Sequence, residues 1–259
     1  MSIKFKFSLF LTFCFINLGF LSFGQSIKEQ AVWYGYFFTI PLSQKWHNVT
    51  ELQERHLVRP IQQNQFMVRT RFHRNLGKNL DASTGLSLFL HHKIGKLEND
   101  DINWPEIRPH LDISLKTKLR KLTLDQRFRG EIRFFQNFDS NHTVLLDGFF
   151  FRAYRSRYRL QASILLAKPW GEKTLNLKLA EEIMGMIGGD YSKFTFDQNR
   201  ISADLSLELS RNIQLELGYV YWHQARNSGG FLDQHIFRTY LRHTLDFTKN
   251  KKKAEMPAF

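Results

Sequence analysis

Hydrophobic and polar residues alternate along Tyr154–Ile164, and the polar set is dominated by arginine. One set is largely aromatic or aliphatic, and the other consists of Arg155, Arg157, Arg159, Gln161 and Ser163. A period of two places these sets on opposite faces of a β-strand. Soluble β-sandwiches also alternate, but their polar face rarely carries an ordered ladder of arginines. The pattern therefore predicts a strand of a transmembrane β-barrel, with one face toward lipid and the other toward the lumen.

The same alternation recurs along the chain and predicts eleven strand segments. These are Ala31–Ile40, Lys45–Val58, Gln65–Leu76, Leu80–Leu90, Glu106–Leu119, Leu122–Phe135, Phe149–Leu166, Thr174–Met184, Phe194–Leu209, Ile213–Gln224 and Ile236–Phe247. Bacterial barrels formed by one chain have an even number of strands. We therefore expect an all-β, antiparallel transmembrane barrel of about twelve strands, in which Gln25–Gln30 runs along the barrel or a further strand escapes the pattern.

The connections between these segments alternate in length. Short ones lie near residues 77–79, 120–121, 168–173 and 211–212, and longer polar ones lie at 92–103, 136–147, 185–193 and 225–234. Bacterial outer-membrane barrels have short periplasmic turns and longer outer loops. The alternation therefore predicts which end of the barrel faces outward.

The N-terminus has the features of an export signal. Lys4 and Lys6 precede the apolar run Phe7–Phe23, and the small residues Ser22 and Gly24 fit a cleavage site before Gln25. The run is short for a membrane anchor, the alternative interpretation. We predict a cleaved signal peptide at 1–24, an outer-membrane barrel at 25–248 and a basic tail at 249–259.

Composition narrows the chemistry further. Cys14, the one cysteine of the chain, lies inside the predicted signal, so the mature protein is expected to have no disulfide or thiolate metal site. The net charge of +13 would suit nucleic acid, but the arginines follow strand spacing and the predicted export signal argues against that partner. We expect outer-membrane lipid and the barrel-assembly machinery as partners, no nucleic acid, and a soluble ligand that the sequence does not identify. The assembly machinery would read a terminal aromatic, either Phe247 or Phe259.

The predicted inward faces carry many charges of both signs. The candidate lumen network consists of Glu51, Arg55, Arg69, Arg71, Arg127, Arg129, Glu131, Arg133, Arg155, Arg157, Arg159, Glu182, Arg200, Glu208 and Glu216. Buried charges must be paired and hydrogen-bonded, which favours a narrow or plugged lumen with a structural or small-solute role. An anion-selective channel lined by arginine is the alternative. A barrel of about twelve strands leaves little room beside so many long side chains.

The sequence offers no catalytic constellation, cofactor motif or metal site. None of the ten histidines is followed two residues later by serine, the pair that outer-membrane lipid hydrolases of this size share. His91 and His92 are adjacent and must point to opposite faces, Glu98–Asp101 suits a solvated loop better than a cation site, and Gly188–Asp190 suits a turn. A lipid-modifying enzyme and a secreted soluble β-protein remain alternatives.

Several short motifs, in order, resemble an outer-membrane β-barrel family, the domain of unknown function 2490 family. They are Trp33–Tyr34, Lys45–Trp46, Glu51–Arg55, Pro105–Pro109, Gln126–Phe134, Arg155–Leu160, Gln198–Arg200 and Leu217–Tyr219. The resemblance covers nearly the whole predicted mature chain and implies a barrel in a Gram-negative outer membrane, without implying any reaction. The chain departs from the pattern at Glu181–Glu182, where Asn-Glu is usual, so either glutamate could be the counterpart.

Overall fold

A computed structural model describes residues 26–77, 79–93, 102–139 and 144–247. The predicted signal peptide, the basic tail and the acidic loop Glu98–Asp101 lie outside these residues. The described residues form eleven strands and no helix, and none of their segments is a helix long and apolar enough to cross a membrane. The strands are β1 Ser26–Pro41, β2 Trp46–Leu57, β3 Gln62–Gly77, β4 Leu80–Lys93, β5 Ile102–Leu119, β6 Leu122–Phe138, β7 Leu145–Trp170, β8 Lys173–Gly188, β9 Tyr191–Glu208, β10 Ile213–Ala225 and β11 Phe231–Thr244.

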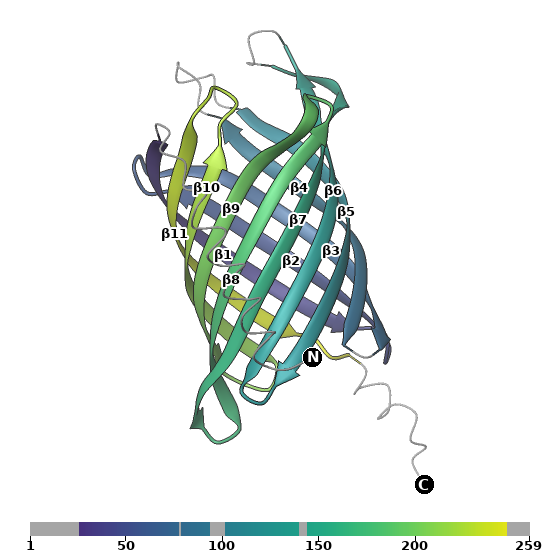
Figure 1. The fold of residues 1–259 in the computed structure, drawn as a ribbon, viewed down its shortest axis with the longest axis vertical. Coiled ribbons are helices and arrows are strands. Elements are labelled where there is room, and N and C mark those ends of the chain that lie inside the picture. Colours follow the sequence, from purple (N-terminus) through teal and green to yellow (C-terminus); the bar gives the residue numbers. More distant parts are fainter. Residues whose placement is uncertain (1–25, 78, 94–101, 140–143, 248–259) are drawn as a thin grey trace.

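The strands close into a barrel in which each pairs with its sequence neighbours and β1 pairs with β11 (Figure 1). Every sequential pair is antiparallel, whereas β1 and β11 run parallel from Ser26 opposite Phe231 to Thr39 opposite Thr244. The prediction of about twelve strands is therefore not confirmed among the described residues. An even number is needed only when every pair is antiparallel, and the parallel β1–β11 pair closes an odd barrel.

The connections divide between two ends of the barrel. The links β1–β2, β3–β4, β5–β6, β7–β8 and β9–β10 lie at one end, called here the turn end, and the remaining links lie at the loop end. Tight turns need unusual backbone angles, and Gly171 supplies a φ of +62° between β7 and β8. The long connection predicted at 185–193 is wrong, because β8 and β9 continue to Gly188 and Tyr191.

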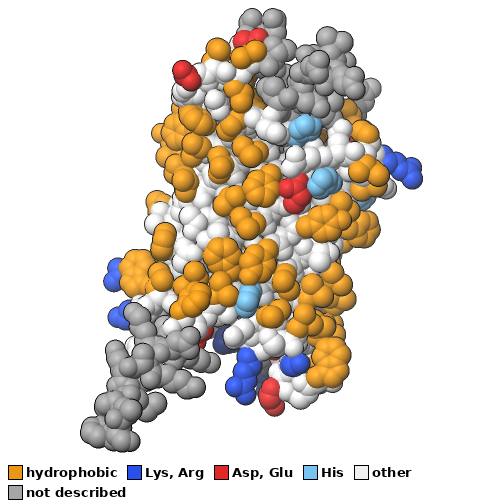
Figure 2. All heavy atoms as spheres, turned by 180° about the vertical axis from the view of Figure 1, so that it is seen from behind, with side chains coloured by type: hydrophobic (Ala, Val, Ile, Leu, Met, Phe, Trp, Pro, Cys, Tyr) orange, Lys and Arg blue, Asp and Glu red, His pale blue; other side chains and the backbone are white. Residues whose placement is uncertain are grey.

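The two faces of the wall follow the predicted alternation. Leu111, Phe128 and Phe237 project outward and are 66%, 56% and 64% exposed, whereas Arg129 and Glu131 project inward and are almost completely buried. Figure 2 shows hydrophobic side chains over much of the wall on the face drawn, with few Lys or Arg side chains in its middle. A soluble barrel would place its apolar side chains inside, so this arrangement disfavours the secreted soluble alternative.

Candidate functional site

The interior of the barrel holds a cavity of about 1160 Å³ that extends to the turn end. Its lining comes from all eleven strands and includes the turn residues Ser43–Trp46, Gly77 and Asn79. Thirteen Lys or Arg residues and seven Asp or Glu residues line it. The cavity is therefore polar and carries an excess of positive charge.

A layer of buried charges lies outside the cavity lining, and we call it the buried ion-pair layer. Glu131 is its centre, with Oε1 2.8 Å from Arg157 Nη1 and 3.4 Å from Arg129 Nη1, and Oε2 3.8 Å from Arg155 Nη1. Arg155 Nη2 lies 2.9 Å from Asp197 Oδ2. Three strands, β6, β7 and β9, thus meet through one connected set of charges. The buried ion-pair layer as a whole consists of Glu106, Arg108, Arg129, Glu131, Arg133, Arg155 and Asp197, and each of these residues is less than a tenth exposed.

Glu106 gathers a second group of cations in the same layer. Its carboxylate accepts hydrogen bonds from Arg108 Nε at 2.6 Å and Arg133 Nη2 at 3.1 Å, and it lies 2.7 Å from His91 Nε2. The guanidinium of Arg108 stacks 3.7 Å from the centroid of the buried Phe89 ring. Charge-assisted hydrogen bonds and a ring contact therefore hold Glu106 and Arg108 in place in this part of the interior.

Ion pairs continue from the buried layer to the cavity wall. Arg157 Nη2 lies 2.8 Å from Glu182 Oε2, and Glu182 Oε1 lies 2.8 Å from Arg127 Nη2. On the opposite side of the interior, Arg69 pairs with Glu51 at 2.6 Å. Glu182 is thus the inward member of the Glu181–Glu182 pair, while Glu181 accepts a hydrogen bond from Asn199 at 3.0 Å.

The structure does not join every residue of the predicted network by ion pairs. Arg55 donates to Gln53 and Gln65, and its guanidinium lies 4.0 Å from the centroid of Trp33. Arg200 stacks 4.1 Å from the centroid of Trp222. Glu208 lies at the end of β9 and accepts a hydrogen bond from the backbone of Thr174. Glu216 pairs with Lys178 and Arg242 near the turn end, apart from the buried layer.

Several residues of the interior were absent from the sequence-based set. Glu106, Arg108 and Asp112 follow the same alternation, so the pattern already predicts that they face inward. It does not predict this for Asp197, because the β8–β9 register shifts at this point: Met184 pairs with Gln198, and Gly185 pairs with Phe196. This bulge lets two consecutive residues, Asp197 and Gln198, both be buried.

Two clusters contain histidine and a carboxylate. The ring nitrogens of His47 and His73 and a carboxylate oxygen of Asp81 lie within 4.8 Å of one another in the cavity. On the other face of the wall, His223 Nδ1 lies 2.6 Å from Asp233 Oδ1, which also accepts a hydrogen bond from Tyr221 at 3.0 Å. His91, which the sequence analysis sets aside as a metal ligand, contacts Gln65 and Glu106.

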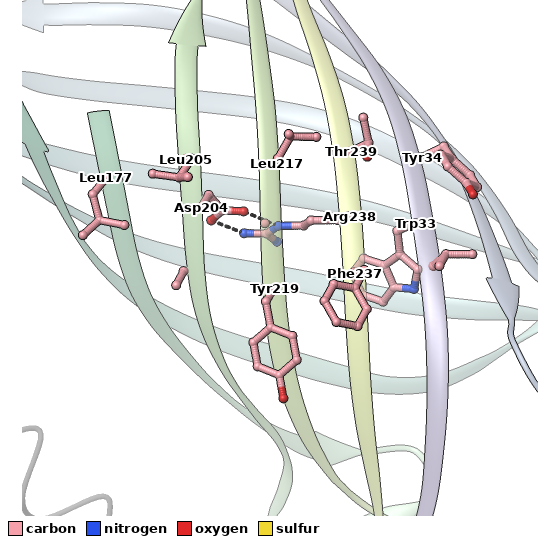
Figure 3. Close-up of a pocket in the computed structure, with 13 residues that line it drawn as sticks. Trp33, Tyr34, Leu177, Asp204, Leu205, Leu217, Tyr219, Phe237, Arg238 and Thr239 are labelled. Carbon is pink, nitrogen blue, oxygen red and sulfur yellow. Dashed lines mark hydrogen bonds and ion pairs between the residues drawn. The ribbon is translucent and has the colours of Figure 1, made fainter. Parts of the chain in front are cut away.

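A shallow hollow of about 450 Å³ lies over β8–β11 and β1 (Figure 3). Leu177, Leu205, Leu217, Tyr219 and Phe237 surround it, and the Asp204–Arg238 ion pair crosses β10 beside it. The pair can cross because residue 218 is glycine: a Cβ there would lie 1.9 Å from Asp204 Oδ1.

The fold and interior together define a closed β-barrel with a charged lumen and an apolar outer wall. Residues 30–246 match the family model described as "Protein of unknown function (DUF2490)", and the chain belongs to this family. No curated protein matches the sequence.

Two solved structures are similar to the chain at 12% sequence identity. A NanC porin has a TM-score of 0.45, and the match covers 83% of this chain and 99% of that one. The β-domain of the Bordetella autotransporter BrkA has a TM-score of 0.43, with 72% of this chain and 78% of that one covered.

The Gly218 contact yields a test of the interior packing. Gly218→Ala should lower the free energy of unfolding by about 1–3 kcal/mol, because the added methyl group displaces Asp204 from Arg238. Gly130→Ala in β6 is the matched control, since nothing lies within 4 Å of its Cβ position. Urea unfolding in detergent, followed by tryptophan fluorescence, measures both. Equal stability of the two variants would contradict the placement of the ion pair.

Proposed function

We propose that this chain is an integral outer-membrane barrel, without catalytic activity, whose lumen is closed by paired charges. Its role would be structural, or the handling of a small solute from one side. The apolar outer wall supports placement in lipid, because a closed barrel satisfies its backbone hydrogen bonds within the bilayer. By the loop lengths, the turn end would face the periplasm and the loop end would face outward.

The observation that carries this proposal is the set of ion pairs around Glu131. Its carboxylate is buried and contacts Arg129, Arg155 and Arg157, and each of these arginines also contacts another acid. Removing one partner from such a set leaves a buried charge without compensation, at a cost of about 3–5 kcal/mol. The mutual pairing therefore favours a rigid layer that blocks passage over side chains that move aside.

An anion-selective channel is the second candidate. The excess of cations along the cavity favours it, because rings of Arg and Lys select anions in pores. The buried ion-pair layer weighs against it, since the residues of that layer do not line the cavity. The two candidates differ in one measurable property, which is steady conductance.

Planar-bilayer recording separates the candidates. The wild type should carry no steady current, whereas Arg155→Ser with Asp197→Ser should open a measurable conductance by removing one buried pair of equal and opposite charge. The double variant Lys168→Ser, Glu172→Ser removes an exposed pair in the β7–β8 turn and should stay closed. A steady anion-selective wild-type current that Arg157→Glu reverses would establish the channel instead.

A second test addresses the membrane face. Leu205→Arg should impair insertion by about 2–4 kcal/mol if the position lies near the bilayer midplane. Asn176→Arg is the matched control, because Asn176 lies opposite Ser206, the next residue along β9, and so shares the same depth while projecting inward. Folding yield into lipid vesicles measures both variants. Equal yields would show that the outer wall does not contact lipid.

A further inference from the structure

We propose that the cavity at the turn end binds a small organic anion that carries two or more phosphate or carboxylate groups. The binding groups would be Arg71, Arg127, Arg159 and Arg200. The inference deepens the proposed function and rests on its closed lumen, because a closed cavity retains a solute that an open pore would pass. The four arginines lie on β3, β6, β7 and β9 and all line the cavity.

As a group, these four arginines make fewer ion pairs with acids than the arginines of the buried ion-pair layer, among the described residues. Neither Arg71 nor Arg200 has an ion pair or a side-chain hydrogen bond to an acid among the described residues. Arg200 instead lies against the rings of Trp33 and Trp222. In the buried layer, by contrast, Arg108, Arg129, Arg133 and Arg155 each contact at least one carboxylate. Both Arg71 and Arg200 thus line the cavity without an ion pair in the described part of the chain.

Arg127 and Arg159 stand directly opposite one another across the β6–β7 pair. Like charges at opposed positions destabilise a sheet. Each has a single acidic partner: Arg127 Nη2 lies 2.8 Å from Glu182, and Arg159 Nη2 lies 3.4 Å from Asp125. The Nε atoms of both are buried without a hydrogen-bond partner in the described structure. An anion between the two guanidinium groups would offset their repulsion and supply acceptors.

Gly85, which pairs with Arg71 on the neighbouring strand, leaves room for the Arg71 side chain to reach the cavity. A Cβ at Gly85 on β4 would lie 2.9 Å from Arg71 Cγ and 2.2 Å from the carbonyl oxygen of Thr70, so glycine leaves room for the arginine to cross β4. The Nε atom of Arg71 is also buried without a partner. Its charge therefore lies at the cavity without a direct ion pair among the described residues.

The size and rim of the cavity point to the class of ligand. A volume of about 1160 Å³ is larger than a single inorganic ion needs and suits a small organic molecule. Lys45, Lys116 and Lys118 add positive charge toward the turn end, where they would attract an anion before it enters. The arginines at several points around the wall favour a ligand with separated anionic groups.

Isothermal titration calorimetry on the full-length protein in detergent tests the inference. Pyrophosphate serves as the phosphate probe and tricarballylate as the carboxylate probe, in a low-salt buffer because the interaction is electrostatic. We expect saturable one-to-one binding of at least one probe, and the tighter probe identifies the preferred anionic group. The double variant Arg127→Gln, Arg159→Gln should raise the Kd at least tenfold, and Arg71→Gln alone should raise it severalfold.

Arg152→Gln is the matched control. Arg152 pairs with Asp190 at 3.6 Å at the loop end and does not line the cavity, so its loss should leave the Kd unchanged. The shift in gel mobility between unheated and boiled samples verifies that each variant is folded, and Lys116→Gln provides a milder second variant on the cavity rim. Absence of binding by both probes, or equal weakening in Arg152→Gln, would overturn the inference.

Failure of this inference differs from failure of the proposed function. Loss of the anion site would appear as an absence of heat in the titration while the bilayer recordings stay silent. An open pore would appear as steady conductance whether or not the probes bind in detergent.

Discussion

The pairing of charge inside the barrel is the constraint on which the rest of the structure depends. A barrel wall with one apolar face has to place its polar side chains in the lumen, and here those side chains are mainly arginines and acids. Desolvated charges are tolerated only with partners. Glu131, Glu106 and Asp197 supply the partners from β6, β5 and β9, and they hold the arginines of β5, β6 and β7 in place. On β5, β6, β7 and β9, the residues of this layer lie on the loop-end side of those that line the cavity.

Strand number and interior filling are linked through the closure of the barrel. The parallel β1–β11 pair places Trp33 beside Ile236 and Val220 in a small apolar cluster on the inner wall. Trp33 in turn stacks with Arg55 and lies near Arg200. The β1–β11 closure thus supplies aromatic surface to Arg55 and Arg200, which line the cavity and make no ion pair within the described residues. The same closure starts β1 at the loop end, so Ser26 lies there and not at the turn end.

The sequence predicts which side of the barrel wall each strand residue faces, but it does not predict which acid each arginine contacts. The period of two assigned Arg129, Glu131 and Arg157 to the interior, because side-chain direction in a strand follows from local geometry alone. Which acid each arginine meets depends on register across strands far apart in sequence, as for Arg127 and Glu182. Glu208 had the right period, yet it lies at a strand end and bonds to backbone.

Bulges and closure set the other limits of the sequence-based prediction. Asp197 could not be assigned inward, because the register shift in β9 interrupts the alternation at this residue. The pattern contains eleven strand segments, but the even number of an all-antiparallel barrel predicts about twelve, and the parallel β1–β11 pair removes that requirement. Both differences arise from hydrogen bonding between strands, which a single-strand pattern does not contain.

A double-mutant cycle between Glu131 and Arg157 tests the central claim most directly. Urea unfolding of the wild type, Glu131→Gln, Arg157→Gln and the double variant gives the coupling energy of the buried pair. A paired, rigid layer predicts a coupling of about 1–3 kcal/mol, because the two residues share one network. A coupling indistinguishable from zero would contradict the account, since the lumen charges would then be independently hydrated and the barrel interior open.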